Sequence, residues 1–437
     1  MKFLAHSIID NVQAVDHSYE GLGVVKIENY PIFVDNLLPY ETAKIIVKKS
    51  NSNFSFARVI ERYNNSPLRV DITNQKLMQS GATALANISY TNQLKFKQNV
   101  VLQLFKRNLN YINVLEILPS EQVWRYRNKF SVFCKMVGST IKTGLYEKNT
   151  HDLIEQYSYE LVTETMEKIL LWLNKNLGNY KCFVKNHNLI QNITIRESSL
   201  NNNTFLIFDV IESFDLPTKF IKDLTHLFPN IVNIFMVKNQ GIVYQYNKKN
   251  VSLTDKIGSL KFKFSWNSFF QINAFQTYNL YDLLINNLNI DANKTVIDAY
   301  SGVGTISLFL AQKAKKVYGL EVNTDAVENA KENSLINNIQ NVEFLAGDVI
   351  KTIEKVKDNI DIVVVDPPRA GMSSKFLSKL VALRPKEIGY ISCNPHTLCR
   401  DCVLLKRHGY ELVYLKPCDM FCQTHHIECV AILKLIK

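Results

Sequence analysis

The stretch of residues 296–366 constrains the fold of this chain more than any other part of the sequence. It opens with a short apolar strand pattern, Val296–Asp298, which runs into the turn Gly302-Val303-Gly304 and then a helical pattern. Strand patterns alternate with helical patterns from there on, which predicts a parallel sheet with right-handed crossovers. The successive strand patterns end at acidic residues: Asp298, Glu321, Asp348 and Asp366. Ligands of such sheets bind at the carboxyl ends of the strands, above the first glycine turn.

The glycine turn and Glu321 narrow the choice of ligand. Glycines let a ligand approach the backbone closely, and Glu321 follows the turn by about 20 residues, where such folds bind a ribose. A pyrophosphate favours a complete G-x-G-x-x-G, but Ser307 takes the third glycine position. Acidic strand ends also suit a cation, so the pattern predicts S-adenosylmethionine, which has a ribose and a sulfonium but no phosphate. A nucleotide-free α/β domain and a degenerate NAD site are the alternatives.

Length and charge indicate a multidomain protein with a polyanionic partner. The 437 residues are long enough for roughly two to four domains. Lysine and arginine total 51 against 40 acidic residues, which gives a net charge of +11 and a pI near 9.0. This balance favours RNA or DNA ahead of a membrane as the partner. A generic basic protein is the alternative.

The sequence predicts a cytoplasmic protein without a membrane segment. No apolar run reaches the ~18 residues of a transmembrane span, and Asp10 interrupts the apolar N-terminus, which argues against a secretory signal. The 8 cysteines crowd toward the C-terminus and do not form a disulfide framework, so a reducing cytosol is the simpler compartment.

Two domains are predicted before the parallel sheet. Residues 1–70 show short alternating patterns and tight turns, which indicate an OB-like β-barrel whose aromatic and basic side chains suit an oligonucleotide. Residues 71–262 contain strand patterns, among them Asn113–Leu118, a helix at Tyr90–Leu109 and a helical block at 161–177, which together indicate a central α+β domain. Residues 263–437 form the Rossmann-like α/β domain.

The stretch Trp124-Arg125-Tyr126-Arg127-Asn128-Lys129 pairs flat rings with cations inside the central domain. That composition suits single-stranded nucleic acid, because bases stack on aromatic rings while cations neutralise phosphates. An edge strand with a structural tryptophan is the alternative. Likewise, the aromatic residues of the barrel can be core residues and its lysines a solvated face.

Reactive side chains gather after the fourth strand pattern. Asp366-Pro367-Pro368-Arg369 predicts a stiff loop, because two prolines fix the backbone and lack N–H donors. Cys393 follows the strand Glu387–Ser392 and precedes a helix that starts near Thr397, so the helix dipole should favour its thiolate. Glu428 lies in an apolar strand pattern, where desolvation should raise its pKa as a general base requires. A buried structural cysteine and a solvent-facing glutamate are the alternatives.

A cysteine nucleophile, a carboxylate base and a methyl donor together specify a reaction. Uracil C5 is a poor nucleophile, but addition of a thiolate at C6 makes C5 an enolate-like carbon that can take a methyl group. A base must then remove the C5 proton so that the cysteine can be eliminated. Within folded RNA, the target base must first be flipped out of its stack.

The chain resembles the RNA (uracil-5-)-methyltransferase family over nearly its whole length. The matching motifs occur in the family's order: F-F-Q-I-N (269–273), D-A-Y-S-G-V-G-T (298–305), L-E-V-N (320–323), D-P-P-R-A-G (366–371), S-C-N-P-x-T-L (392–398) and T-H-H-I-E (424–428). The first 70 residues resemble the family's TRAM RNA-binding domain through G-L-G-V-V, P-I-F-V-D-N-L-L-P-Y-E and S-P-L-R-V.

The resemblance implies S-adenosylmethionine-dependent methylation of uridine C5 in RNA, with Cys393 as nucleophile and Glu428 as base. It implies donor contacts from four residues: Gln271, Tyr300, Glu321 and Asp366. A TRAM domain resembles the ribosomal-RNA branch more than the transfer-RNA branch, so 23S rRNA is the expected substrate and the tRNA T-loop the alternative. We expect a monomer. A non-catalytic RNA-binding factor on the same fold is the alternative from another class, and the presence of Cys393 and Glu428 argues against it.

The sequence departs from the family's pattern at its cysteines. Much of the ribosomal-RNA branch carries an iron–sulfur cluster on four cysteines, with a C-G-G-C element. Here Ser80-Gly81-Ala82-Thr83 takes that place and no cysteine precedes Cys134, so we expect neither a cluster nor another metal. Cys399 replaces a small residue and forms a C-x-x-C spacing with Cys402. No second pair lies at metal spacing, which makes this a weak candidate for a redox or zinc site.

Overall fold

The computed structural model describes residues 3–249 and 252–436, which fall into two compact units. The first comprises Met1–Val100 with Phe421–His425, and the second comprises Val101–Met420 with His426–Lys437. The predicted domain boundaries at residues 70 and 262 divide the chain differently and stay a prediction. Among the described residues, no helix combines the length and the apolar character needed to cross a bilayer.

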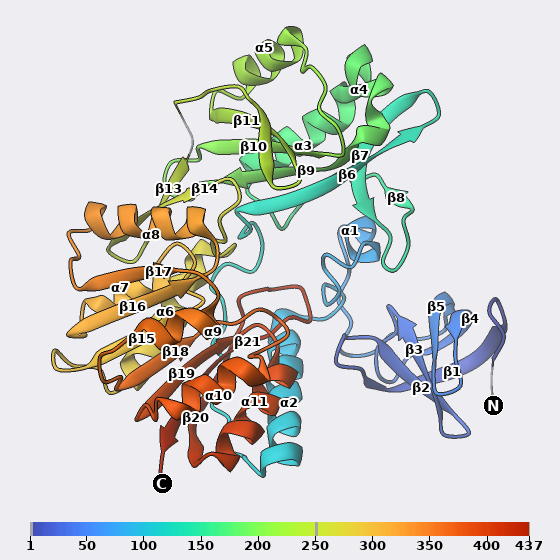
Figure 1. The fold of residues 1–437 in the computed structure, drawn as a ribbon. Coiled ribbons are helices and arrows are strands. Elements are labelled where there is room, and N and C mark those ends of the chain that lie inside the picture. Colours follow the sequence, from blue (N-terminus) through green and yellow to red (C-terminus); the bar gives the residue numbers. More distant parts are fainter. Residues whose placement is uncertain (1–2, 250–251, 437) are drawn as a thin grey trace. The chain divides into compact units, whose positions relative to one another are not determined.

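A closed five-stranded barrel fills most of the first unit and confirms the predicted OB-like barrel (Figure 1). Its strands are β1 (Ile8–His17), β2 (Gly23–Ile27), β3 (Tyr30–Asp35), β4 (Thr42–Ser50) and β5 (Ser55–Arg62), in the order β1-β2-β3-β5-β4. In β3, Tyr30, Ile32 and Val34 are buried and the residues between them are half-buried. This period of two places one side of each strand in the barrel core.

The carboxylate of Glu41 ties the barrel to the segment that follows it. Glu41 is 0% exposed, and it accepts hydrogen bonds from Arg62 Nε at 3.1 Å and Arg69 Nη2 at 2.7 Å. The backbone N–H groups of Leu38 and Ser66 donate to it as well. Desolvation raises the pKa of Glu41, but the hydrogen bonds from Arg69, Leu38 and Ser66 outweigh it, so the net pKa is lowered. Helix α1 (Gln75–Gln79) and the start of α2 (Tyr90–Leu109) complete this unit.

The second unit contains a seven-stranded mixed sheet with helices packed on one face (Figure 1). The sheet order is β12-β11-β10-β9-β6-β7-β8, with β6 (Lys129–Val137), β7 (Thr140–Tyr146), β8 (Leu153–Ile154), β9 (Ile190–Glu197), β10 (Thr204–Val210), β11 (Ile231–Lys238) and β12 (Gly241–Gln245). Its helices are α3 (Glu164–Asn176), α4 (Lys181–Lys185) and α5 (Thr218–Leu227). This confirms the predicted central α+β fold. A hairpin of β13 (Ser252–Ile257) and β14 (Leu260–Ser265), which the sequence did not indicate, follows.

The last part of the second unit is the predicted Rossmann-like sheet, in the order β17-β16-β15-β18-β19-β21-β20. Its strands are β15 (Thr295–Ala299), β16 (Lys316–Glu321), β17 (Val342–Ala346), β18 (Ile362–Val365), β19 (Glu387–Ser392), β20 (Tyr410–Cys418) and β21 (Glu428–Leu435). Its helices are α6 (Ala274–Asn287), α7 (Thr305–Ala311), α8 (Thr324–Ile336), α9 (Val349–Thr352), α10 (Ser374–Ala382) and α11 (Pro395–Arg407). Strands β15 to β19 are parallel, whereas β21 is antiparallel and lies between β19 and β20.

Strongly periodic segments were predicted well and one short segment was not. The helices predicted at Tyr90–Leu109 and Ala274–Asn287 and the strand predicted at Glu387–Ser392 are confirmed. The strand predicted at Asn113–Leu118 is wrong. It runs beside β20, where Leu115 N and Leu118 N donate to the carbonyls of Leu415 and Pro417, but it forms only one isolated bridge, Leu118 to Cys418, and not a continuous strand.

We expect Glu41→Gln to destabilise the barrel by about 3–5 kcal/mol, because it leaves two partly buried arginines without their anion. Hydrogen exchange of the barrel amides in increasing urea measures this loss. Glu61→Gln is the matched control, since Glu61 is exposed on the same barrel and a surface change should stay within about 0.5 kcal/mol. Equal protection in both variants would contradict a stabilising role for Glu41.

Candidate active site

The turn after β15 lies at the point where the sheet order reverses. β15 has β16 on one side and β18 on the other, which is where ligands of open α/β sheets bind. The turn is left-handed at three residues, with φ of 69° at Tyr300, 54° at Gly302 and 82° at Gly304. A Cβ on Gly304 would lie 2.8 Å from the Phe344 ring, so glycine is required there. A Cβ on Gly302 would meet nothing within 4 Å, so the backbone at that residue borders open space.

Two predicted donor contacts, Tyr300 and Glu321, lie at this turn. The carboxylate of Glu321 accepts hydrogen bonds from Gly302 N at 3.0 Å and from Asn323 N at 2.8 Å. These bonds fix the carboxylate at the carboxyl end of β16. Tyr300 is half-buried and its ring packs edge-on against Phe376, with centroids 5.5 Å apart. A tyrosine with positive φ is uncommon and is characteristic of functional sites.

The loop after β18 carries Asp366 and is held by helix α11. Asn394 Nδ2 donates to the carbonyl of Arg369 at 3.0 Å, and the hydroxyl of Thr397 donates to the same carbonyl at 3.2 Å. Gly371, with φ of 75°, is packed so closely that a Cβ would lie 2.6 Å from Arg400 Nη2. The two prolines and these contacts make the loop stiff, as the sequence predicted.

Asp401 joins this loop to the strand that precedes Cys393. It is 0% exposed, and its Oδ2 accepts hydrogen bonds from Met372 N at 2.9 Å and from the Tyr390 hydroxyl at 2.8 Å. Arg400 provides the counter-charge, with Nη2 at 2.7 Å from Oδ1. The sequence alone did not single out Asp401. The available signal was its position: the apolar pattern of α11 requires an apolar residue there, but the sequence has a charged one.

Strand pairing brings Cys393 and Glu428 together. β19 and β21 are antiparallel and their register ends at Ser392 opposite Cys429. One further step in that register places Cys393 opposite Glu428, at the carboxyl end of the parallel strands. Cys393 is half-buried and Glu428 is 2% exposed. Among the described residues, Glu428 Oε2 is one of the buried oxygens without a hydrogen-bond partner.

The electrostatics of this corner differ from the expectation for Cys393. Burial and the negative charges of Glu428 and Asp366 raise the pKa of the Cys393 thiol to about 12, although Arg369 opposes the shift. The prediction that the helix N-terminus makes the thiolate the favoured form is therefore wrong for the ligand-free protein. Burial is the largest cause of the raised pKa, and the two carboxylates add to it.

Both carboxylates are themselves shifted toward the protonated form. Burial raises the pKa of Asp366 to about 7. Burial, together with the charge of Asp366, also raises the pKa of Glu428 well above its ordinary value, and Arg369 opposes this. These directions agree with the prediction made for Glu428. A carboxylate with a pKa near 7, as at Asp366, can take up and release protons near neutral pH.

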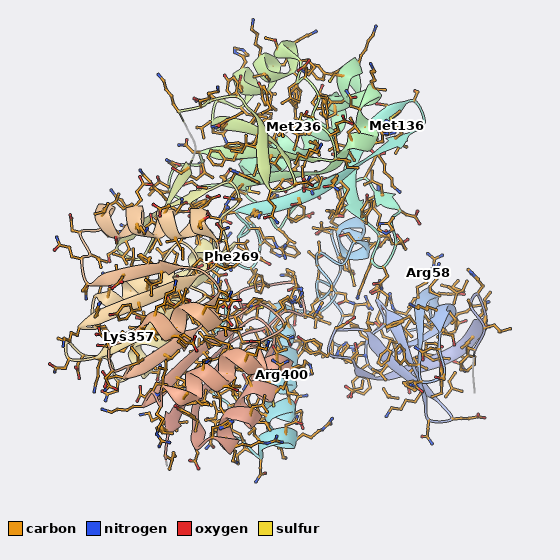
Figure 2. All side chains as sticks on the ribbon, viewed as in Figure 1. Arg58, Met136, Met236, Phe269, Lys357 and Arg400 are labelled. Atoms are coloured by element: carbon orange, nitrogen blue, oxygen red, sulfur yellow. The ribbon has the colours of Figure 1, made fainter. Side chains whose placement is uncertain are left out.

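Gln271 lies on a loop that the central sheet holds in place. Asn128 donates from Nδ2 to the carbonyl of Gln271 at 3.1 Å and from its backbone N to the carbonyl of Ile272 at 3.0 Å. The fully buried Arg196 donates to the carbonyl of Ser268 at 2.6 Å. On this loop Phe269 is 67% exposed, and Figure 2 shows its position. The sequence analysis named Asn128 only within a stretch expected to bind RNA and missed Arg196.

The cysteines of the C-x-x-C spacing behave as buried apolar residues. Cys399 and Cys402 lie on α11, are at most 2% exposed, and have pKa values raised by burial. Within the described part of the chain, no group of three or more histidine, cysteine or acidic side chains is placed to hold a metal ion. The residues at 80–83 do not fit the ligand set of an iron–sulfur cluster, and the absence of a cluster stays a prediction.

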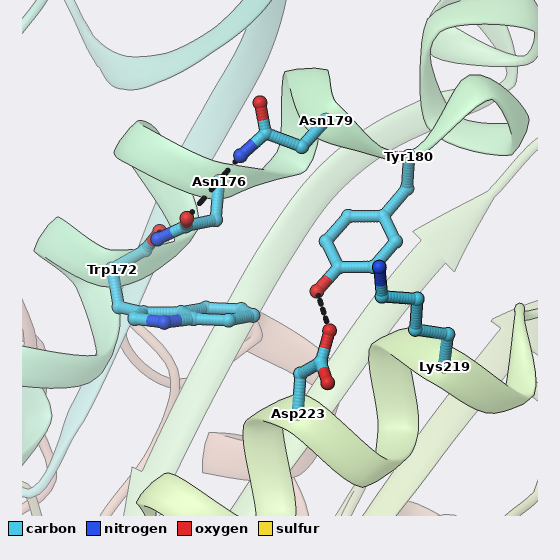
Figure 3. Close-up of a pocket in the computed structure, with 6 residues that line it drawn as sticks. All are labelled: Trp172, Asn176, Asn179, Tyr180, Lys219 and Asp223. Atoms are coloured by element: carbon cyan, nitrogen blue, oxygen red, sulfur yellow. Dashed lines mark hydrogen bonds between the residues drawn. The ribbon is translucent and has the colours of Figure 1, made fainter.

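Two cavities lie apart from the predicted site residues. One, of about 330 Å³, lies on the central domain among Trp172, Asn176, Asn179, Tyr180, Lys219 and Asp223 (Figure 3). The other, of about 480 Å³, lies between α2 and α11 and is lined in part by Leu104, His396 and Arg407. Neither contains Cys393 or Glu428.

We expect alkylation of Cys393 by iodoacetamide to be slow at pH 8 and to rise with pH without levelling below pH ~10, because a raised pKa keeps the thiol protonated. Asp366→Asn removes a negative charge, lowers the thiol pKa and should speed alkylation about tenfold at pH 8. Peptide mass spectrometry separates Cys393 from the other thiols. Asp358→Asn, a change at an exposed site, is the control, and equal rates in the two variants would refute the electrostatic account.

Comparison with known proteins identifies the family. The sequence profile of the tRNA (uracil-5-)-methyltransferase family matches residues 89–436, and that of the TRAM domain matches residues 12–60. An uncharacterized RNA methyltransferase from Oceanobacillus iheyensis is 39% identical over 96% of this chain and 95% of its own length. One from Lactobacillus johnsonii is 34% identical over 98% of each chain.

A solved structure shares the fold. It is the Pyrococcus abyssi tRNA (uracil-54, C5)-methyltransferase in complex with S-adenosyl-L-homocysteine, with a TM-score of 0.75 and 24% identity, covering 96% of this chain and 99% of that one. Three findings agree with the resemblance found in the sequence: the two matching sequence profiles, the similar relatives and the shared fold. The chain therefore belongs to the tRNA (uracil-5-)-methyltransferase family and is an RNA methyltransferase that carries a TRAM domain.

Proposed function

We propose that the protein methylates C5 of a uridine in RNA with S-adenosylmethionine as donor, through a covalent bond between Cys393 and C6 of the base. The observation that carries this proposal is the register of β19 and β21, which sets Cys393 opposite Glu428. A thiol and a carboxylate at one corner of the sheet are the two groups that this chemistry requires. An amino-methyltransferase has no use for the thiol.

The chain's residues around the glycine turn fit the donor. Asp298 Oδ1 and Ser301 Oγ are buried and have no hydrogen-bond partner within the described residues, and Gly302 borders open space. Burial raises the pKa of Asp298 to about 7. Gln271, Tyr300, Glu321 and Asp366 would hold the donor, with Glu321 toward its ribose. When bound, S-adenosylmethionine supplies an electrophilic methyl group on a cationic sulfur.

Cys393 and the carboxylates beside it would move the protons. Cys393 must first lose its proton, and Asp366, whose pKa burial raises to about 7, can accept a proton near neutrality. The thiolate then adds to C6 of the uracil. After C5 is methylated, Glu428 removes the C5 proton, the bond between sulfur and C6 breaks, and the thiolate of Cys393 is regenerated.

We propose 23S ribosomal RNA as the substrate, on the argument that a TRAM barrel is typical of the ribosomal-RNA branch. A second candidate is the tRNA T-loop. The fold match to the Pyrococcus tRNA enzyme extends over 96% of this chain and so includes most of the barrel. A barrel of this kind is therefore compatible with both RNA classes.

We expect Glu428→Gln to form a covalent RNA adduct that does not resolve, because glutamine cannot take the C5 proton. Denaturing gel electrophoresis with radiolabelled total RNA should show the variant retarded with bound RNA, and mass spectrometry should place the link at Cys393. Cys393→Ala is the control and should give neither adduct nor turnover. An adduct that persists in Glu428→Gln/Cys393→Ala would exclude Cys393 as the nucleophile.

We expect loss of the gene to remove a 5-methyluridine from 23S rRNA and to leave tRNA unchanged. Mass mapping of methylated nucleosides in both RNA fractions, from cells with and without the gene, measures this. Cells that carry the Cys393→Ala variant should match the cells that lack the gene. A loss confined to tRNA would establish the second candidate, and no change in either fraction would argue for a non-catalytic role.

A further inference from the structure

Strand β6 presents two different faces. Phe130, Val132 and Cys134 are buried, whereas the residues between them are half-buried. Val132 pairs with Ile193 of β9, which pairs with Phe208 of β10, so these three side chains share one face. Phe208 stacks on Phe183 of α4, with ring centroids 5.6 Å apart, so that face is the one covered by helices. The half-buried residues of β6 lie on the opposite face: Lys129, Ser131, Phe133 and Lys135.

Two aromatic rings are stacked on this open face. The rings of Phe133 and Tyr146 have centroids 4.1 Å apart and planes 16° apart. Tyr146 is diagonal to Phe133 across the β6–β7 hairpin, because the residue directly opposite Phe133 is Gly144. Both rings are half-buried, so part of each stays open to solvent. Stacked rings held on an open sheet face are an arrangement on which nucleic-acid bases stack.

Cations and polar groups lie on the same face. Lys135 Nζ is 5.6 Å from the Tyr146 ring centroid and donates to the carbonyl of His151 at 2.5 Å. Among the described residues, no carboxylate lies within ion-pair distance of Lys129 or Lys135, whereas Lys142 is paired with Glu155 at 3.4 Å. The hydroxyls of Ser131 and Thr194 are hydrogen-bonded at 2.6 Å, beside Asn192 and Asp209, which bond to each other at 3.2 Å.

The open face begins at the loop that carries a predicted donor contact. Asn128 holds the backbone of Gln271 and Ile272, and β6 starts at the next residue, Lys129. From Lys129 to Lys135 the strand covers about 20 Å. A single RNA strand leaving the active site could follow this row, with phosphates beside the lysines and bases against the rings.

We propose that this face of β6 and β7, defined by Lys129, Ser131, Phe133, Lys135 and Tyr146, binds the unpaired RNA strand that flanks the target uridine. The inference rests on the proposed function, because it takes its ligand from that reaction. Charge favours RNA as the occupant, since Lys135 lies beside the Tyr146 ring without a carboxylate partner among the described residues, while burial and Arg196 lower the pKa of Lys129 to about 8. A double helix would not fit the role, because its bases are already stacked and cannot reach the rings.

The experiment compares full-length variants for binding of a fluorescein-labelled single-stranded oligouridine and of a labelled RNA duplex. We expect Phe133→Leu/Tyr146→Leu, which keeps apolar bulk but removes the flat rings, to weaken oligouridine binding at least about fivefold. Tyr180→Leu is the matched control. Its ring lines the cavity of Figure 3, on the helix-covered side, and packs against Phe220, which also contacts Phe183.

Lysine variants test the same face without removing any ring. Lys135→Ala should reduce the slope of log affinity against log salt by about 0.7, the contribution of one phosphate contact on a single strand. Lys219→Ala, in the cavity of Figure 3, should leave the slope unchanged. Binding of S-adenosylhomocysteine, measured by calorimetry, should be the same in all variants, which shows that the fold and the donor site are intact.

The outcomes separate this inference from the proposed reaction. Unchanged oligouridine affinity in Phe133→Leu/Tyr146→Leu and an unchanged salt slope in Lys135→Ala would overturn the inference, whatever the methylation assays give. Equal weakening for the duplex and the single strand would overturn the assignment to unpaired RNA. Selective weakening together with no Cys393 adduct in Glu428→Gln would support the RNA face while the proposed reaction fails.

Discussion

The antiparallel pairing of β21 with β19 is the constraint on which the chemistry of this protein depends. A fully parallel sheet would carry the segment after β19 away from Cys393 through a crossover helix. Here the chain makes β20 first and returns as β21 between β19 and β20. That return sets the start of β21, Glu428, against the end of β19. A residue thirty-five positions away in sequence thus becomes the neighbour of the predicted nucleophile.

The cost of this arrangement is electrostatic. Asp366, Glu428 and the Cys393 thiol lie at one corner, where both carboxylates raise the pKa of the thiol and Asp366 also raises the pKa of Glu428. The corner is therefore best suited to the protonated forms until a positive charge arrives. A cationic ligand at the acidic strand ends would favour the thiolate through the same Coulomb interactions that now oppose it. Binding of a cationic ligand would therefore increase the reactivity of the Cys393 thiol, and this coupling follows from the charges alone.

The loops around this corner are fixed by residues that take no part in the proposed reaction. Asp401 connects the Asp366 loop with β19, and Asn128 and Arg196 hold the loop of Gln271 from the central sheet. These contacts make the two sheets of the second unit interdependent. The same Asn128 immediately precedes β6, the strand that carries Phe133, so one short segment would serve both the donor loop and the proposed RNA face.

The sequence by itself determined the fold class, the alternation of strands and helices in the Rossmann-like domain and the residue types of the site. Hydrophobic periodicity, the glycine turn and the acidic strand ends are local, so Glu321, Asp366 and Cys393 could be named without a structure, and the family resemblance added Tyr300. Only the tertiary structure decided the raised pKa of Cys393, the roles of Asp401 and Arg196, and the face on which Phe133 meets Tyr146. Each of these depends on which distant strands become neighbours. Burial and charge act through space, so their effects cannot be read from the spacing of residues along the chain.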